Sequence, residues 1–430
     1  MLIEFRVKNF KSFQDESVLS MVASSDTSLP NNTMTSKSFK HKLLRSAVIY
    51  GANASGKSNL IEALVFADRF IRKSARNEPH EQIAVKPFLL DQESRQMPSE
   101  FEFSFIHGKV LYQYGFSVDH QRVHSEWLIA SPKGRSQIWF ERTLADEKND
   151  SYEWYFGPNL KGKKAQQRDL TKPNSLFFSV AVAFNNQQLA RVYEWFAKRL
   201  QFIHSESGDL LPQLAAIQSL KSQQIHSSVQ KMLKIADLGV VDFSVEEITL
   251  TEEDLRDVPD ELRPLLLGEE QLRIQMEHRD KLGQSVAFAF EDESLGTRRL
   301  FALSIALINV LSKGHVIVID ELDASLHPWI IKSLLTPFND PDSNPHNAQL
   351  IFNTHDVTLF DPSIFRRDQI WLIQKDQGGA SHLYPLLKFS PRKNEALTKG
   401  YLQGRYGAIP FIREDLLKGL VFNGLGVLDR

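Results

Sequence analysis

The sequence predicts an α/β protein with a mixed, mainly parallel core sheet, an antiparallel β subdomain and a helical insertion. Residues 315–319 and 349–354 are mainly apolar runs of the kind that strands buried on both faces of a parallel sheet show. A third apolar run, 47–50, precedes a glycine-bounded loop and then a helical pattern. Between residues 101 and 156 apolar and polar residues alternate. That period of two indicates an antiparallel meander.

Composition excludes several classes of protein. The 42% hydrophobic and 24% charged residues are ordinary for a soluble globular protein, and 430 residues are enough for two or three domains. The longest apolar stretch, 300–311, is too short to span a bilayer, and the charged N-terminus is not a signal peptide. The absence of cysteine excludes disulfides, thiol catalysis and cysteine-ligated zinc. We therefore expect a cytoplasmic protein that has no membrane partner.

We expect three parts along the chain. Residues 1–204 form an N-terminal lobe, which contains the antiparallel β insert at about 98–160. Residues 205–285 form a mainly helical insertion that includes a strand at 240–250 and an acidic, proline-punctuated helix at 252–267. Residues 286–430 form the C-terminal lobe. No heptad run is present, so a long coiled-coil arm is not expected.

The loop after the first apolar run reads G-A-N-A-S-G-K-S-N, from Gly51 to Asn59, and a helical pattern follows it. A strand, a loop of this spacing ending in G-K-S and a helix form a P-loop. The loop's N–H groups and the helix N-terminus bind nucleotide phosphates. Lys57 would reach the β- and γ-phosphates, and Ser58 would hold Mg²⁺. The sequence thus predicts an ATP–Mg²⁺ site whose nucleotide-binding residues include Gly51, Asn53, Ser55, Gly56, Lys57, Ser58 and Asn59.

Two later strands end in polar residues that complete this site. Asp320 and Glu321 follow the run at 315–319, where ligands gather in open α/β sheets. Asp320 would bind Mg²⁺ with Ser58, and Glu321 would act as the general base toward the attacking water. His355 follows the next strand and could bond the γ-phosphate or that water. The plain alternatives are that Asp320 and Glu321 form an ordinary acidic turn and that His355 is structural. The order of these residues after a P-loop favours a catalytic role instead.

A second phosphate-binding element reads S-L-G-T, with Ser294 and Gly296 at the start of the helix at about 297–311. A helix N-terminus offers N–H groups to an anion, although a simple helix cap would also explain Ser294. One chain cannot readily bring two phosphate sites to one γ-phosphate. We therefore expect a second copy to place its Ser294 and Gly296 across the nucleotide.

The order of these motifs resembles the ABC-type ATPases, and within them the SMC, RecF and OLD-like AAA proteins. The resemblance rests on N-F-K-S-F, the P-loop, the antiparallel insert, S-L-G-T, V-I-V-I-D-E, L-D-A-S-L-H-P and T-H-D. The opening M-L-I-E-F-R-V-K-N-F and the closing G-Y-L-Q-G-R-Y-G-A-I-P are similar to abortive-infection and restriction-linked ATPases of the AbiL/RloA kind. The resemblance covers nearly the whole chain, least of all 205–285.

The resemblance implies a P-loop NTPase fold of ABC-ATPase type and further roles for single residues. Lys11 and Ser12 would contact the nucleotide, Ser294 would be the signature serine, Asp323 a dimer contact and His355 the switch histidine. The loop departs from the family at Ala54, where glycine is commoner. The family's glutamine that links the antiparallel insert to Mg²⁺ is not evident. Its place could be taken by Asn185, Asn186 or Gln187.

The function that the resemblance implies is ATP hydrolysis by a head-to-head dimer, or a higher oligomer, in antiphage defence. Such a sensor or scaffold would control a separately encoded effector, such as a TOPRIM-like nuclease or a toxin, because residues 356–430 contain no D-x-D pair. The alternative is a RecF/SMC-like DNA-binding ATPase of repair or recombination. The net charge of −2 gives no global basic field for nucleic acid. A DNA-binding ATPase would contact DNA through the local basic cluster of Lys161, Lys163, Lys164, Arg168 and Lys172. The simpler explanation of this cluster is a solvated loop.

Overall fold

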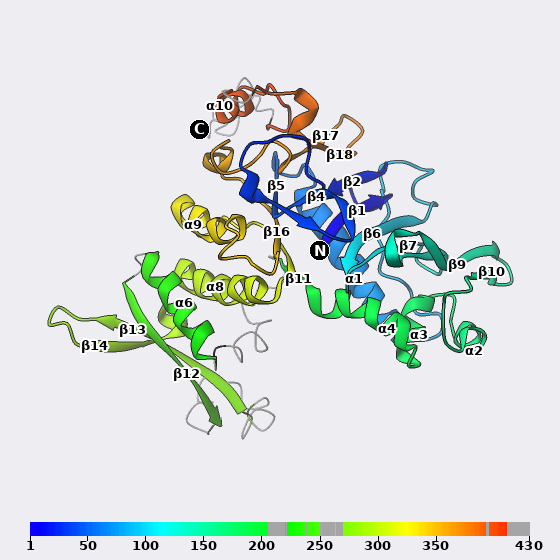
Figure 1. Cartoon of the computed structure of the whole chain (residues 1–430), viewed down its shortest axis with the longest axis horizontal. Coiled ribbons are helices and arrows are strands. Elements are labelled where there is room, and N and C mark those ends of the chain that lie inside the picture. The colour runs from blue at the N-terminus through cyan, green and yellow to red at the C-terminus, as the bar shows by residue number, and fades with distance from the viewer. Residues whose placement is uncertain are drawn as a thin grey trace, which may run out of the picture.

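The computed structural model describes residues 1–204, 220, 222–236, 239–249, 251, 263, 270–392 and 395–410. A mainly parallel sheet stands beside an antiparallel one, and a smaller three-stranded sheet projects from the opposite side of the molecule (Figure 1). This mixed α/β arrangement confirms the predicted fold class.

The mainly parallel sheet carries the phosphate loop. Its strand order is β11-β15-β16-β5-β17-β18, and only the last pair is antiparallel. Every residue of β5, β15 and β16 is buried, as their mainly apolar sequences predict. The strands are β11 (Leu200–Ile203), β15 (Val316–Ile319), β16 (Gln349–Asn353), β5 (Ser46–Gly51), β17 (Ile370–Lys375) and β18 (Ser381–Pro385).

Alternate residues of this sheet belong to two different hydrophobic cores. In β5, Ala47 and Ile49 join the core shared with the antiparallel sheet, whereas Val48 and Tyr50 join the core under the C-terminal helices. The first core contains α1 (Lys57–Lys73), and the second contains α8 (Leu295–Lys313) and α9 (Pro328–Asn339). Among the described helices, only α8 is long and apolar enough to cross a membrane, and its apolar side is packed in the second core.

The antiparallel sheet has the strand order β10-β9-β8-β7-β6-β1-β2. Its alternation turns Phe103 and Phe105 inward, where they pack on the rings of Trp195 and Phe196. The strands expected at about 98–160 run from Ser99 to Phe156. They are β6 (Ser99–His107), β7 (Val110–Val118), β8 (Val123–Ser131), β9 (Gln137–Asp146) and β10 (Ser151–Phe156); β1 (Leu2–Lys8) and β2 (Ser17–Ser20) complete the sheet.

Three short helices follow the antiparallel strands, and further short elements connect the larger ones. The helices are α2 (Lys164–Asp169), α3 (Phe177–Ala183) and α4 (Gln187–Glu194), followed by a π turn (Trp195–Arg199). The remaining elements are β3 (Thr33–Ser36), β4 (Phe39–Leu44), α10 (Leu397–Leu402) and 3-10 turns at Pro30–Asn32, Ser74–Arg76, Pro132–Gly134, Phe290–Asp292, Val357–Leu359 and Leu386–Phe389.

The expectation of a mainly helical insertion at 205–285 is wrong for the described part of that segment. One helix, α6 (Gln223–Ile235), packs beside a sheet of β12 (Val240–Thr249), β13 (Glu270–Arg279) and β14 (Ser285–Ala289). In β13, Ile274 and Met276 are buried and their neighbour Gln275 is not, which is the period of a strand. The helix expected at 252–267 lies outside the described residues, except for Arg263.

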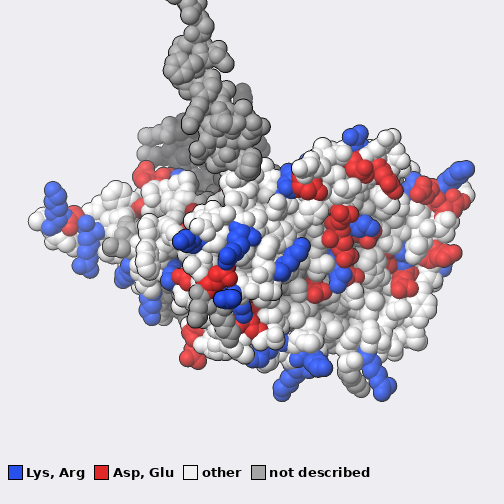
Figure 2. Space-filling model, turned by 90° about the horizontal axis from the view of Figure 1, so that it is seen from above, with Lys and Arg blue, Asp and Glu red and all other residues white. Residues whose placement is uncertain are grey.

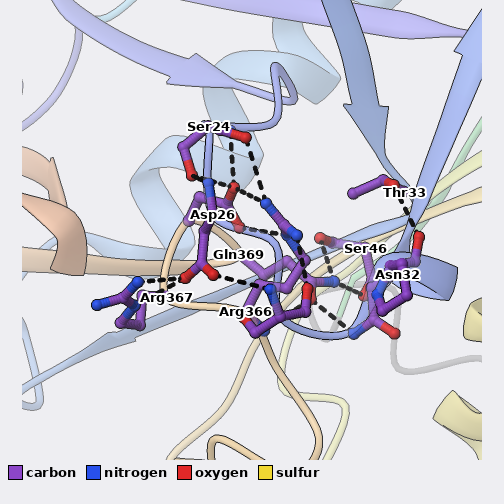
Figure 3. Close-up of polar contacts among 11 residues, drawn as sticks. Ser24, Asp26, Asn32, Thr33, Ser46, Arg366, Arg367 and Gln369 are labelled. Atoms are coloured by element: carbon purple, nitrogen blue, oxygen red, sulfur yellow. Dashed lines mark hydrogen bonds and ion pairs between the residues drawn. The ribbon is translucent and has the colours of Figure 1, made fainter. Parts of the chain in front are cut away.

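A polar network joins the segment after β2 to the turn before β17 (Figure 3). Arg366 and Asp368, both nearly fully buried, form a bidentate ion pair, and Asp368 also accepts bonds from the Ser24 backbone and hydroxyl. Gln369 donates to Ser46 of β5 and accepts a bond from Asn32. These contacts set the start of β17 against β5, and therefore the position of the strand that flanks the phosphate loop.

Candidate functional site

The loop between β5 and α1 is built on two glycines that no other residue could replace. A Cβ at Gly51 would lie 2.5 Å from the Ile373 carbonyl oxygen. Gly56 has φ of 112°, and its Cβ would lie 2.3 Å from Ser381 Oγ. Ala54 adopts a left-handed conformation, with φ of 58°, where glycine would be unstrained. The departure at Ala54 is therefore accommodated at some backbone strain.

Lys57 lies beneath the loop and is 5% exposed. Its Nζ donates to the carbonyl oxygens of Gly51 at 2.9 Å and Ala52 at 3.0 Å. Burial lowers the pKa of Lys57 to about 8, and the nearby carboxylates of Asp320 and Glu321 oppose that shift. An anion in the loop would supply the negative partner that this buried ammonium lacks. Within the loop, Asn53 is exposed, and Ser55 Oγ is buried without a hydrogen-bond partner among the described residues.

Ser58 and Asp320 meet where α1 begins and β15 ends. Ser58 Oγ donates to Asp320 Oδ1 at 3.2 Å. A hydroxyl and a carboxylate are hard oxygen donors that suit Mg²⁺, which takes its remaining ligands from phosphate and water. The described residues contain no group of three or more His, Cys, Asp or Glu side chains that could hold a metal unaided. The pair therefore fits an ion that is bound together with a nucleotide.

Asn353, the last residue of β16, was not predicted from the sequence. Its side chain is fully buried; Nδ2 donates to Asp320 Oδ1, and Oδ1 accepts a bond from the Glu321 backbone N–H. One amide thus holds both residues of the Asp320–Glu321 turn. The available signal was a polar residue at the end of an otherwise apolar strand, directly before T-H-D.

Glu321 has φ of 51°, a left-handed conformation that is rare outside glycine. The Arg299 guanidinium of α8 donates to the Glu321 carbonyl oxygen. Burial lowers the pKa of Arg299, while Glu321 and Asp323 oppose the shift. Backbone strain held by surrounding contacts is typical of functional sites. Arg299, also missed in the sequence, links the helix that carries Ser294 to this turn.

His355 and Asp323 lie together at the same edge of the sheet. The His355 backbone N–H donates to Asp323 Oδ2 at 3.0 Å, and Asp323 Oδ1 is buried without a partner among the described residues. Burial, and then the charge of Lys57, lower the pKa of His355, so its imidazole is neutral at pH 7. The charges of Lys57, Asp323, Glu321 and Asp320 all act on His355, so these side chains lie in one electrostatic environment.

Ser294 caps α8: its Oγ accepts a bond from the Thr297 N–H at 3.1 Å. A Cβ at Gly296 would lie 2.9 Å from the Ser325 carbonyl oxygen, so glycine lets the helix start approach the loop after β15. Ser294 and the neighbouring Leu295 are exposed. Among the described residues, Ser294 Oγ bonds Thr297 and no residue of the phosphate loop.

Lys11 and Ser12 contact the phosphate loop and α1 from below. Ser12 is buried; its Oγ accepts a bond from Asn59 Nδ2 at 2.7 Å and shares a hydrogen bond with Ser381 Oγ at 2.8 Å. Ser381 is itself within 2.6 Å of the Ser55 carbonyl oxygen, to which it donates. Lys11 forms an ion pair with Glu62 of α1. Ser12 and Ser381, which was not predicted, therefore support the loop. The Asn59 side chain is bonded to Ser12, so it does not point toward a nucleotide in the loop.

The three candidates for the missing glutamine lie elsewhere. Asn186 caps α4 and donates to the Lys161 carbonyl oxygen and to Gln167 Oε1, while Asn185 and Gln187 line the same groove as Lys161. Tyr193 of α4 donates to the Arg72 carbonyl oxygen, so α4 contacts the C-terminal end of α1, whereas Ser58 lies at its N-terminal end. The structure brings none of the three into a described contact with Ser58 or Asp320.

Comparisons with known proteins agree with a nucleotide site. Residues 46–361, most of the chain, match the family model described as "AAA domain, putative AbiEii toxin, Type IV TA system". The matched region spans the phosphate loop, Ser294, the Asp320–Glu321 turn and His355. No curated protein matches the chain.

Solved SMC head structures are similar to this chain at low identity. The SMC head domain from Thermotoga maritima is 12% identical with a TM-score of 0.38, covering 89% of this chain and 98% of that chain. A Smc head with an extended coiled coil bound to the C-terminal domain of ScpA, derived from Pyrococcus furiosus, is 15% identical with a TM-score of 0.39, covering 89% and 96%. An SmcHead bound to the C-winged helix domain of ScpA is 15% identical with a TM-score of 0.42, covering 89% and 97%.

Proposed function

This chain belongs to the AAA domain family that residues 46–361 match, and we propose that it binds ATP with Mg²⁺ and hydrolyses the ATP to ADP and phosphate. The observation that carries the proposal is the meeting of Ser58 Oγ and Asp320 Oδ1, 3.2 Å apart, beside the buried ammonium of Lys57. These groups come from opposite halves of the chain. A metal–phosphate complex held between these three groups explains why they come together.

The residues would divide the work of phosphoryl transfer among them. Ser58 and Asp320 would hold Mg²⁺, which neutralises charge on the β- and γ-phosphates when bound. Lys57 would exchange the loop carbonyls for phosphate oxygens. Glu321, its backbone fixed by Asn353 and Arg299, would accept the proton of the attacking water. His355, neutral at pH 7, would donate a hydrogen bond to the γ-phosphate or to that water.

Glu321→Gln tests the catalytic assignment. The amide keeps the shape of the side chain but cannot act as a base, so we expect kcat for ATP hydrolysis to fall at least about a hundredfold. Binding of a fluorescent ATP analogue should change less than about threefold, because no phosphate contact is removed. Glu291→Gln, at an exposed glutamate near the start of α8, is the matched control and should hydrolyse ATP normally. Wild-type turnover in Glu321→Gln would contradict the assignment.

The exposed Ser294 supports a composite site in which a second copy closes over the nucleotide. In that head-to-head dimer, or a higher oligomer built from it, Ser294 and Gly296 of one copy would face the phosphate loop of the other. Asp323, whose Oδ1 is buried without a partner among the described residues, would lie near that interface. ATP would then act as the link between two copies as well as the substrate.

We also propose a role in abortive-infection defence of the AbiL/RloA kind, in the cytoplasm; what supports it is a family description that names an AbiEii toxin and a type IV toxin–antitoxin system. ATP-driven assembly would hold or release a separately encoded effector, such as a TOPRIM-like nuclease or a toxin. We predict that co-expression of this chain with the product of an adjacent effector gene lowers phage plating at least about tenfold, and that Glu321→Gln changes the effect. Equal plating with wild-type chain, Glu321→Gln and empty vector would contradict the defence role and leave the ATPase proposal standing.

A further inference from the structure

A groove of about 860 Å³ opens between the antiparallel sheet and helices α2 to α4, in the part of the chain that follows the sheet. Tyr112 of β7 and Trp139 of β9 form its floor. The segment around Lys161 and the turn between α3 and α4 form its walls. No residue of the phosphate loop or of the Asp320–Glu321 turn lines it, so it is separate from the nucleotide site.

The groove has a strongly one-sided charge. Lys161, Lys163 and Arg191 line it, and no aspartate or glutamate does. All three side chains are exposed, and none forms an ion pair within the part of the chain that the structure describes. On the face shown in Figure 2, by contrast, acidic and basic side chains are interspersed. The three cations of the groove would therefore attract an anion that no acidic side chain of the lining repels.

The five basic residues at 161–172 differ in their side-chain contacts. Lys164 donates to the Gly157 carbonyl oxygen at 3.4 Å, and Lys172 donates to the carbonyl of Asn77. Arg168 pairs with Asp169. Of these five, Lys161 and Lys163 line the groove and have no side-chain bond or ion pair among the described residues, and Arg191 of α4 joins them from a distant part of the sequence.

The other lining side chains offer a ring and free amides. Phe184, at the end of α3, is 54% exposed, which is unusual for a large aromatic residue. Gln166, Asn185 and Gln187 are exposed carboxamides with no side-chain hydrogen bond among the described residues. Gln188 accepts a bond from the Lys161 N–H at 2.7 Å, which ties the segment around Lys161 to α4.

We propose that this groove binds a short segment of single-stranded nucleic acid. The three cations would contact phosphates, and Phe184 would stack on an unpaired base. The carboxamides carry both donors and acceptors, as the edges of bases require. An acidic peptide would contact the cations but would have no partner for the Phe184 ring or for the oxygens of the carboxamides. A duplex keeps its bases stacked inside and could not reach Phe184. This site is independent of the proposed ATPase.

Fluorescence anisotropy tests the proposal with labelled 12-nucleotide single strands of DNA and of RNA, a 12-base-pair duplex and a poly-glutamate peptide, all without ATP. We expect single strands to bind more tightly than the duplex or the peptide. Three phosphate contacts predict a slope of about −2 in log K against log salt concentration. Comparison of the DNA and RNA arms shows which sugar the groove prefers.

Two variants locate the binding. The triple change Lys161→Glu, Lys163→Glu and Arg191→Glu should weaken single-strand binding at least about tenfold, and Phe184→Ala about fivefold, the lower end of one lost base stack. The matched control reverses the same number of charges at the exposed Lys231, Lys234 and Lys399, far from the groove, and should bind like wild type. Equal losses in the control, duplex binding as tight as single-strand binding, or tighter binding of poly-glutamate would overturn the proposal.

Discussion

At the scale of single residues, Asn353 shows how one buried amide can organise a reaction centre. It bonds the carboxylate of Asp320 and the backbone N–H of Glu321, and so fixes the predicted metal ligand relative to the predicted base. Because its described side-chain bonds go to Asp320 and Glu321 and not to the phosphate loop, we assign Asn353 as a positioning residue. Groups that orient metal ligands from behind commonly contribute tenfold to a hundredfold to activity.

Asn353→Ala should lower kcat for ATP hydrolysis about tenfold to a hundredfold and leave KM within about threefold, because the phosphate contacts survive. Steady-state kinetics with varied ATP measure both constants. Asn344→Ala is the matched control, since Asn344 is an equally buried amide just before the other end of β16 and bonds Ala348. Both variants should lose thermal stability. The interpretation fails if Asn344→Ala loses as much kcat as Asn353→Ala.

The residues that sequence reasoning found and missed differ in a physical way. Lys57, Ser58, Asp320, Glu321 and His355 stand in local patterns that fold predictably, at the ends of apolar runs or in a glycine-bounded loop. Asn353, Ser381 and Arg299 act because separate elements meet in three dimensions. No local pattern records such a meeting, so these three required the coordinates.

At the scale of elements, α1 carries an unusual buried acid. Asp68 lies on the side of α1 that packs in the protein interior and is 5% exposed. Arg72 lies 3.4 Å from Oδ2, but Oδ1 has no partner among the described residues. Burial raises the pKa of Asp68 to about 7, and Arg72 only partly opposes the shift. The folded protein therefore binds a proton at Asp68 that the unfolded chain releases near pH 4.

This shift has a definite sign for stability. Between about pH 4 and pH 7 the folded state holds more protons than the unfolded state, so the contribution of Asp68 to stability falls as pH rises through that window. Asp68→Asn removes the penalty, and its gain in unfolding free energy should be larger at pH 8 than at pH 5 by on the order of 1–3 kcal/mol. Urea denaturation at the two pH values measures the difference. Asp15→Asn, at an exposed aspartate, should show none. An equal gain at both pH values would contradict the raised pKa.

The sequence predicted the type of an element correctly where the hydrophobic pattern was strong. The buried runs of β5, β15 and β16 and the alternating strands from Ser99 to Phe156 are of this kind. The strand expected at 240–250 corresponds to β12, but β13 was missed because this charged strand buries only alternate residues such as Ile274 and Met276. A pattern that sparse does not distinguish a strand from an amphipathic helix.

At the scale of the whole molecule, the parallel sheet is covered on both faces, and its carboxyl edge gathers the predicted ATP ligands. Ser294 and Gly296 begin α8, and Ser294 is exposed to solvent. Arg299 of that helix bonds the Glu321 carbonyl, so a second copy that engaged Ser294 would bear directly on the turn that holds the predicted base. The central claim is therefore that a complete site needs two chains.

Mixing two inactive variants tests that claim most directly. Lys57→Ala removes the phosphate contact, and Ser294→Arg blocks the outward-facing signature, so each variant alone should hydrolyse ATP at less than about 1% of the wild-type rate. In an equal mixture, random pairing makes half of the dimers hybrids, each with one complete site, and activity should return to about a quarter of wild type. A mixture as inactive as its components, or a Ser294→Arg variant that is fully active alone, would contradict the two-chain site.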